Sequence, residues 1–272
     1  MKAVPTSERL TPEDSQATEE SSLIYAYHLA TYNYCVKYVS DRIVLDYGCG
    51  SGYGTALISK HCRQAIGVDV SSEAIHHAQQ KYHARNLAYR LVERAEDAPL
   101  PFPDRSFEVV ISLQVIEHVS NVALYLKDIS RVLAPGGYAI LATPDRSSRL
   151  LSFQKPWNMW HLREYSKDQL QDTLSAYFSD VRVLNLGGQK ETLQVELDRT
   201  RRLRWLTLPV TLPFTPELVR VNGLRVLRWL RFVLRPVTPA GDAKSADDAQ
   251  FRISENEEYS INLVAVARRG HS

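Results

Sequence analysis

Short apolar segments alternate with amphipathic segments through the first half of the chain. Runs of mostly apolar residues predict β-strands at residues 43–46, 64–69, 88–92, 107–113 and 138–143. Apolar positions at helical spacing predict α-helices between them, at residues 55–61, 71–82 and 122–133. Strands that alternate with helices at these lengths indicate a parallel sheet with helices on both faces.

The second half of the chain adds a helix and two further strands. A helix is predicted at 166–178 with Ser166 as its N-cap, and strands are predicted at 180–186 and 259–268. We therefore expect an α/β fold with a doubly wound, seven-stranded, mostly parallel sheet.

Two segments lie outside this pattern. Residues 22–39 predict a helix with Ser21 or Ser22 as its N-cap. A low-complexity linker is predicted at 238–250. Three parts are expected in all: a flexible arm at 1–21, a core at 22–189 plus 257–270, and an inserted basic amphipathic cap at 190–256.

The composition excludes several classes of protein. With 272 residues, 44% of them hydrophobic, the chain can bury a sizeable core and is not a disordered protein. A net charge of +2 gives no overall nucleic-acid signature, so no nucleic-acid partner is expected. The three cysteines form no CxxC pair, which argues against a disulfide framework or a cysteine-based zinc site.

The sequence indicates neither a secretory signal nor a membrane-spanning helix. The N-terminal residues contain no apolar signal segment. No uninterrupted apolar run reaches the roughly 18 residues that a spanning helix needs. We expect a cytoplasmic protein, with peripheral contact at the inner membrane face as an alternative.

The strongest chemical signal is a glycine-rich turn after the first predicted strand. Its sequence is VLDYGCGSGYG at residues 44–54. Glycine lets the backbone approach a ligand closely and adopt positive φ. Asp46 precedes the turn, and Asp69 ends the next strand, where a doubly wound sheet places an acid at ribose hydroxyls. A carboxylate such as Asp46 repels a pyrophosphate and suits a cationic sulfonium, which favours S-adenosylmethionine over a nicotinamide cofactor.

Several segments, in order, resemble the motifs of class I S-adenosylmethionine-dependent methyltransferases of the type-11 kind: LDYGCGSGYGT, GVDVS, IEHV and RVLAPGGY. The resemblance covers about residues 40–187, and the strand at 259–268 fits the last strand of the family. It implies a Rossmann-like methyltransferase fold and S-adenosylmethionine as the cofactor. The IEHV, TPDR and HLREYS segments resemble methyltransferases of bacterial glycan and natural-product clusters, and IEHV also resembles quinone-ring O-methyltransferases.

The resemblance also implies a set of cofactor contacts. The glycines would pack under the methionine and ribose, Asp46 would orient the amino-acid end, and Asp69 would accept the ribose hydroxyls. Arg94 stands where many relatives carry an Asp, which leaves adenine recognition to backbone groups or to Glu96. The implied contacts are Asp46, Gly48, Gly50, Gly52, Asp69, Val70, Ala95, Glu96 and Gln114.

Catalysis would centre on His118. Methyl transfer from a sulfonium is an in-line displacement that needs alignment but no metal, so no metal site is expected. A hydroxyl acceptor benefits from a general base, and His118 follows the fourth strand at the ligand-binding edge of the sheet. Glu117 could orient the imidazole. A packing or capping role for His118 is an equal alternative.

Aromatic and polar residues after the fifth strand suit a sugar or aromatic acceptor, and the acceptor as a whole is expected to be small or lipid-linked. The candidates are Trp157, His161, Arg163 and Tyr165. A packed loop is the alternative for each of them taken singly. The expected acceptor group is a hydroxyl of a glycan, quinone-like or natural-product substrate. N- or C-methylation and a noncatalytic cofactor-binding partner subunit stay open as alternatives.

The predicted insertion is strongly basic. Residues 199–235 contain nine arginines and one acid. Wound as a helix, residues 217–235 carry arginines on one side and Trp and Leu on the other, a pattern typical of membrane-surface helices. Alternatives are a cap packed on the core, which is slightly favoured, and a homodimer face; a nucleic-acid groove ranks third.

Overall fold

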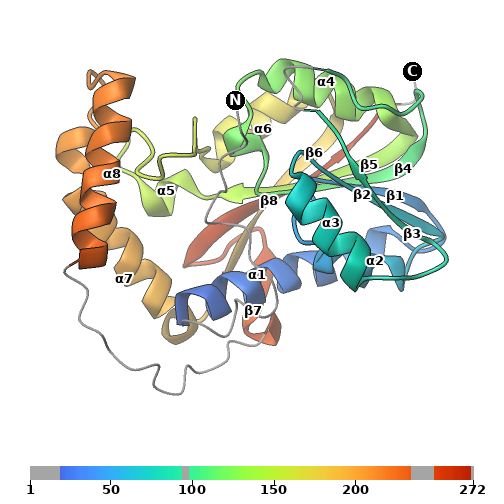
Figure 1. The fold of residues 1–272 in the computed structure, drawn as a ribbon, viewed down its shortest axis with the longest axis horizontal. Helices are drawn as coiled ribbons and strands as arrows, with labels where there is room; N and C mark the ends of the chain where they lie inside the picture. The colour runs from blue at the N-terminus through green and yellow to red at the C-terminus, as the bar shows by residue number, and fades with distance from the viewer. Residues whose placement is uncertain (1–18, 94–97, 234–247, 271–272) are drawn as a thin grey trace.

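The computed structural model describes residues 19–93, 98–233 and 248–270. These residues form an α/β fold around a single sheet with strand order β3-β2-β1-β4-β5-β8-β6-β7 (Figure 1). The first five strands along the chain run parallel to one another. This arrangement confirms the predicted doubly wound, mostly parallel sheet.

The strands fall close to the predicted segments, with one addition. β8 pairs antiparallel with β5 on one side and with β6 on the other. Their bounds are β1 Ile43–Tyr47, β2 Gln64–Asp69, β3 Leu87–Leu91, β4 Phe107–Leu113, β5 Leu133–Pro144, β6 Ser179–Gly188, β7 Phe251–Ser254 and β8 Ser260–Arg268.

The additional strand corrects the prediction of seven strands to eight among the described residues. β7 lies within the segment expected to be cap, 190–256, and pairs antiparallel with the edge strand β6. Phe251 is buried and meets the ring of Tyr27 with centroids 6.3 Å apart. A short strand that pairs at an edge satisfies backbone groups which β6 would otherwise leave open. This strand was not predicted because its four residues, directly after the predicted low-complexity linker, are too few to show an alternating pattern.

Helices cover both faces of the sheet, as the apolar strands require. On one face, α4 (Val122–Val132) and α6 (Lys167–Ser175) pack against Leu45, Val110 and Ala265. On the other face lie α1 (Glu19–Cys35), α2 (Tyr53–Ser59) and the start of α7 (Lys190–Leu206). The remaining helices are α3 Ser72–Lys81, α5 Arg146–Arg149 and α8 Glu217–Val233.

Local capping signals placed several helix ends correctly. Ser71 and Ser166 each accept a hydrogen bond from the third backbone N–H of the helix that follows, and Gln169 completes a capping box with Ser166. By contrast, α1 begins at Glu19, before the N-cap predicted at Ser21 or Ser22. No helix among the described residues is long and apolar enough to cross a lipid bilayer.

α7 and α8 stand to one side of the sheet, at the left of Figure 1, away from α2 and α3. Arg220 fixes α8 in place because its guanidinium is buried, pairs with Glu217 and donates to the carbonyl of Pro156 at 2.7 Å. The sequence pattern assigned Arg220 to a solvated basic side. The structure instead uses it to join the helix to the loop that follows α5.

Candidate functional site

The glycine turn lies between β1 and α2, where the strand order reverses and ligands bind in open α/β sheets. Gly48, Gly50 and Gly52 all have positive φ, at 86°, 53° and 86°. A Cβ on Gly48 would come within 2.3 Å of Val115, and one on Gly52 within 2.6 Å of Ala78. Both glycines are therefore required by packing.

Gly50 has a different surrounding. A Cβ built on it would meet no heavy atom of the described residues within 4 Å, apart from its chain neighbours. Open space thus lies directly above the backbone at this position. The turn presents a cradle into which a ligand can approach the main chain closely, as the cofactor implied by the sequence requires.

Asp69 ties the turn to the end of β2. One carboxylate oxygen accepts the backbone N–H of Gly50 at 3.0 Å, and the other accepts that of Ser71 at 2.8 Å. An ionised carboxylate has further lone pairs on both oxygens, so it can also accept the hydroxyls of a ribose. The next residue, Val70, is exposed at the same edge, where an adenine contact was predicted. The other two predicted adenine contacts, Ala95 and Glu96, lie outside the described residues.

Asp46 lies beneath the turn and is fully buried. Its carboxylate accepts a hydrogen bond from the Thr55 hydroxyl at 2.6 Å and another from the Tyr32 hydroxyl at 3.1 Å. Burial raises the pKa of Asp46 to about 7, although these two hydrogen bonds act in the opposite direction. Its partners in the structure are thus the hydroxyls of two protein side chains.

Tyr32 is one of the tyrosines of residues 22–39 that the sequence offers as residues lining a site, with packing at the domain edge as the favoured alternative for most of them. It comes from α1, and a Cβ on Gly54 would lie 2.0 Å from its ring, so Gly54 allows α1 to pack directly on the start of α2. In the sequence, Gly54 follows the G-x-G-x-G pattern as a fourth glycine. The reason for it can be seen only in the fold, where α1, which precedes the motif in the chain, packs against this position.

Gln114 directly follows β4 and has φ of 57°, in the left-handed region that residues other than glycine seldom adopt. Its N–H donates to the carbonyl of Ala142 at 2.8 Å, which joins the ends of β4 and β5. The next residue is Val115, which packs over Gly48. This strained corner therefore lies at the same sheet edge as the glycine turn, and the predicted contact of Gln114 with the cofactor stays a prediction.

Three predicted residues of the acceptor side lie together. Glu117 and His118 form a short 3-10 turn, Ile116–His118, after β4, and the loop carrying His161 folds back onto it. The N–H of Leu162 donates to the carbonyl of Glu117 at 2.9 Å. The rings of His118 and His161 meet edge to face with centroids 4.9 Å apart.

Both histidines have defined orientations. Nδ1 of His118 lies 3.1 Å from the carbonyl oxygen of Trp160, and Nδ1 of His161 lies 2.7 Å from the carboxylate of Glu164. Because a carbonyl or an ionised carboxylate only accepts, each Nδ1 carries the proton and donates it. Burial raises the pKa of Glu164, but the Arg149 charge and His161 outweigh burial and lower it to about 2. Glu164 therefore stays ionised.

Arg149 and Glu164 are a second pair that the sequence did not single out. They form a buried ion pair at 3.0 Å. The guanidinium of Arg149 lies 4.1 Å from the ring centroid of Trp157. In the sequence, the three-residue spacing of His161 and Glu164 in the HLREYS segment was the feature that could have indicated their contact. No sequence feature indicated that Arg149, which lies on α5, would join them.

The other predicted acceptor residues have structural surroundings. Trp157 stacks on Arg149, and Tyr165 is buried in the core cluster under α4 and α6. The guanidinium of Arg163 donates to the carbonyl of Ser120 at 2.9 Å. Of the four candidates, His161 is the one that the structure brings to His118. Trp157, Arg163 and Tyr165 shape the loop that carries it.

Comparison with known proteins shows similarity to methyltransferases. Residues 45–141 match the family model of the methyltransferase domain. A probable S-adenosylmethionine-dependent methyltransferase of Mycobacterium tuberculosis is 36% identical over 160 residues, which are 58% of this chain and 57% of that protein. A ubiquinone biosynthesis O-methyltransferase of Bradyrhizobium diazoefficiens is 29% identical over 148 residues, which are 52% of this chain and 58% of that protein.

A solved structure shows the same fold. An S-adenosylmethionine-dependent methyltransferase of Thermotoga maritima, described as a possible histamine N-methyltransferase, superposes with a TM-score of 0.56 and 16% identity. The match covers 91% of each chain. The chain thus spans less than two thirds of the length of either curated relative. Residues 45–141 therefore match a methyltransferase domain, and S-adenosylmethionine is the cofactor that this match and the named relatives imply.

Proposed function

We propose that this methyltransferase-domain protein transfers the methyl group of S-adenosylmethionine to a hydroxyl of a small or lipid-linked acceptor. The observation that carries the proposal is the open cradle above Gly50, bordered by Asp69, with His118 at the end of β4 on the same sheet edge. Cofactor and acceptor would meet at the switch point between β1 and β4.

The residues of the turn suit a sulfonium donor. When bound, S-adenosylmethionine supplies an electrophilic methyl group on a positively charged sulfur. Gly50 leaves room for close approach of the backbone, and Asp69 accepts ribose hydroxyls while it holds the turn. Asp46 and Asp69 place negative charge beneath and beside the turn, which favours a cation over a pyrophosphate. The protein contributes alignment and electrostatics to an in-line displacement.

His118 is suited to accept the proton of the acceptor hydroxyl. Its Nδ1–H donates to Trp160, so Nε2 of the neutral ring carries the lone pair. The proton would pass from the hydroxyl oxygen to Nε2 as the oxygen takes the methyl group. Glu117 is fully buried next to this ring and would stabilise the imidazolium that forms.

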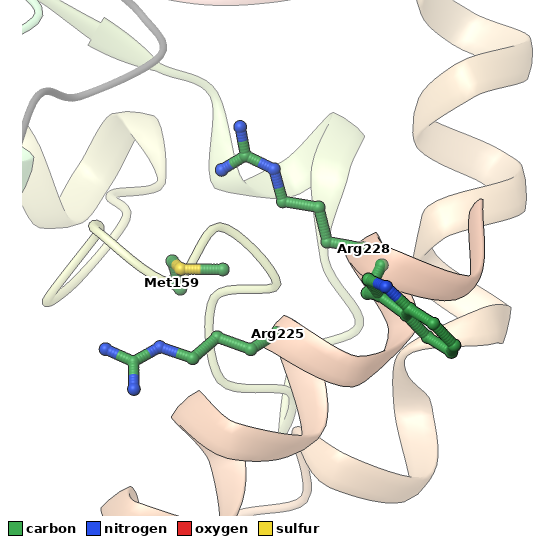
Figure 2. Close-up of a pocket in the computed structure, with 4 residues that line it drawn as sticks. Met159, Arg225 and Arg228 are labelled. Atoms are coloured by element: carbon green, nitrogen blue, oxygen red, sulfur yellow. The ribbon is translucent and has the colours of Figure 1, made fainter. Parts of the chain in front are cut away.

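An open surface hollow of about 330 Å³ lies between α8 and the loop after β5, lined by Met159, Arg225, Arg228 and Trp229. Figure 2 shows both arginine side chains reaching from α8 toward the loop that carries Met159. Two guanidinium groups beside apolar side chains suit an amphiphilic acceptor with an anionic group, such as a phosphate-linked lipid. A quinone-like hydroxyl is the acceptor class that agrees with the name of the Bradyrhizobium diazoefficiens relative.

The outer side of α8 supports peripheral membrane contact as a second proposal. Leu218 and Trp229 are 74% and 61% exposed, and Val226 lies exposed near them. Arg225 and Arg228 are also exposed on this helix, and Arg201 and Arg202 are exposed on α7. An apolar strip bordered by arginines complements an anionic lipid surface. A lipid-linked acceptor would reach the site from such a surface.

Calorimetry with S-adenosylhomocysteine and with NAD tests the proposed cofactor. We expect one molecule of S-adenosylhomocysteine to bind per chain and NAD not to bind. Asp69→Ala should reduce that affinity by at least about ten-fold, because the ribose loses an acceptor. Asp172→Ala, on the exposed side of α6, is the matched control. Binding of NAD alone would overturn the proposal.

Methyl-labelled cofactor then tests the acceptor class. Label should appear on hydroxyl acceptors such as hydroxylated quinones and glycosides. Transfer to amine or carbon acceptors alone would favour N- or C-methylation. A protein that binds S-adenosylhomocysteine but leaves every acceptor of such a panel unlabelled would favour a noncatalytic partner subunit.

A further inference from the structure

We propose that Glu117, His118 and His161 bind a divalent transition-metal ion beside the cofactor cradle. One carboxylate oxygen and one nitrogen of each imidazole lie within 4.8 Å of one another. Glu117 and His161 are buried and His118 is half-buried, so the group lies inside the fold and not on its surface. The sequence predicts no metal here, because His161 joins the other two only through the loop after β5.

The surroundings of both imidazoles are those of metal ligands. In such sites, each histidine donates its second N–H to a carbonyl or carboxylate, which fixes the ring and directs the other nitrogen to the ion. His118 donates Nδ1–H to the carbonyl of Trp160, and His161 donates Nδ1–H to Glu164. Nε2 of each ring is therefore the nitrogen that would ligate. Glu164 is itself held by Arg149.

The carboxylate of Glu117 is oriented as well. Its Oε2 accepts the hydroxyl of Thr143 at 3.0 Å, and its carbonyl accepts the N–H of Leu162. A fully buried carboxylate is costly unless a positive charge compensates it. Glu164 is paired with Arg149, and Glu117 supplies the carboxylate of the cluster itself.

The donor set indicates which ions fit. Two imidazole nitrogens and one carboxylate oxygen suit Zn²⁺, Mn²⁺, Fe²⁺ or Co²⁺, whereas Ca²⁺ and Mg²⁺ prefer all-oxygen sites. Three protein ligands leave coordination positions open for an oxygen of a bound molecule. The cluster lies after β4 at the edge where the acceptor would enter. The site therefore offers a place for the acceptor hydroxyl.

A role in methyl transfer would rest on the function proposed above. An acceptor hydroxyl bound to the ion would have a lowered pKa and would release its proton to water. The oxygen would then form a bond to the methyl carbon as the carbon–sulfur bond breaks, leaving a neutral thioether. With the ion bound, His118 would serve as a ligand and not as the base.

Metal titration of chelator-treated protein without an affinity tag tests the site. We expect one Zn²⁺ or Mn²⁺ per chain by calorimetry and elemental analysis. Glu117→Gln and His161→Gln should each weaken binding by at least about ten-fold. His76→Gln, on the exposed face of α3, should leave it unchanged. Less than one ion per chain, or equal affinity in Glu117→Gln and wild type, would overturn the proposal.

Two further measurements keep the test decisive. X-ray absorption of the wild-type protein with bound Zn²⁺ should show scattering from two imidazoles, and one or none would overturn the proposal even if the variants fail to fold. Calorimetry with S-adenosylhomocysteine is run on the same samples. If the protein binds metal but not S-adenosylhomocysteine, the proposed function is wrong and the metal site stands. If it binds S-adenosylhomocysteine but not metal, the metal site is wrong and the proposed function stands.

Discussion

The hydroxyl of Tyr32 in α1 donates a hydrogen bond to the buried carboxylate of Asp46 in β1, with the two oxygens 3.1 Å apart. This contact joins the first helix to the strand that leads into the glycine turn. Burial nevertheless raises the pKa of this carboxyl to about 7, so a titratable group lies beneath the glycine turn. Both stability and cofactor affinity should therefore depend on pH through this residue.

Asp46→Asn tests the first of these effects. The pKa of Asp46 is higher in the folded chain, about 7, than its ordinary value of 3.8, so the folded state holds the proton between these values. The resulting stability is full below about pH 4 and is lost as the pH rises to 7. Asp46→Asn has no such proton. The unfolding free energy of wild type should fall relative to the variant by up to about 4 kcal/mol across this range.

Urea unfolding at pH 4.5, 6 and 8 measures this difference. Tyr32→Phe is the companion variant, because it removes one donor to Asp46 and should cost about 1.5–3 kcal/mol above pH 8, where the carboxylate is charged. A wild-type minus Asp46→Asn difference that stays flat from pH 4.5 to 8 would contradict the raised pKa.

Cofactor affinity should rise with pH over the same range. S-adenosylmethionine carries a positive sulfonium, so it binds better when Asp46 is ionised, and binding should release part of a proton near pH 6 to 7. Calorimetry in two buffers of different ionisation enthalpy measures the release. Asp46→Asn should abolish the proton release, and an equal release in that variant would show that another group titrates.

Gly50→Ala and Gly48→Ala separate ligand space from packing space. A Cβ on Gly50 enters open space, so Gly50→Ala should fold with a loss of about 1–2 kcal/mol for its positive φ and should bind S-adenosylhomocysteine poorly. Gly48→Ala would collide with Val115 and should unfold at lower denaturant. Thermal melts and calorimetry measure both. Normal binding by Gly50→Ala would show that the ligand does not lie over this residue.

His118→Ala should separate binding from turnover. S-adenosylhomocysteine affinity should be unchanged, because His118 lies on the acceptor side. Methyl transfer should fall by about 10²–10⁴, the contribution expected of a positioned base. Steady-state assays with labelled cofactor measure the loss. An unaltered turnover rate would remove His118 from the mechanism and leave it a packing role.

Liposome flotation tests the outer side of α8. Wild type should bind vesicles rich in phosphatidylglycerol at low salt and detach as the salt concentration rises. Arg225→Glu with Arg228→Glu should reduce binding at least about ten-fold, because each arginine near such a surface contributes about 1 kcal/mol. Lys60→Glu with Arg85→Glu, both exposed near α2 and α3, makes the same charge change elsewhere. Equal loss in both double variants would contradict a docking role for α8.

The sequence predicted best where the signal is local. β2 and β4 begin and end where predicted, and the glycine turn was found from its own residues, because strand periodicity and positive-φ glycine act over a few positions. The sequence did not predict contacts between residues that lie far apart in the chain. Tyr32 meets Asp46, and Arg149 meets Glu164, across separate elements.

Arg220 is a further residue whose surroundings the sequence did not predict. The helical periodicity of the sequence placed Arg220 on the same side of the helix as other arginines of α8. Periodicity does not show which side of a helix faces the protein. The fold turns that arginine inward to the loop after α5 and leaves Leu218 and Trp229 exposed. Amphipathic periodicity gives two sides of a helix, and only the packing partner decides which side is buried.

The pairing of Gly188 with Phe251 has a consequence for how such enzymes diversify. The chain leaves the sheet at Gly188 and returns to it at Phe251, so α8 is joined to the sheet through an edge pair of strands and not through an inner one. The inner strands β1, β2, β4 and β5 form their pairs without it. Under the proposed function, changes in α8 would alter the acceptor side while the glycine turn stayed the same.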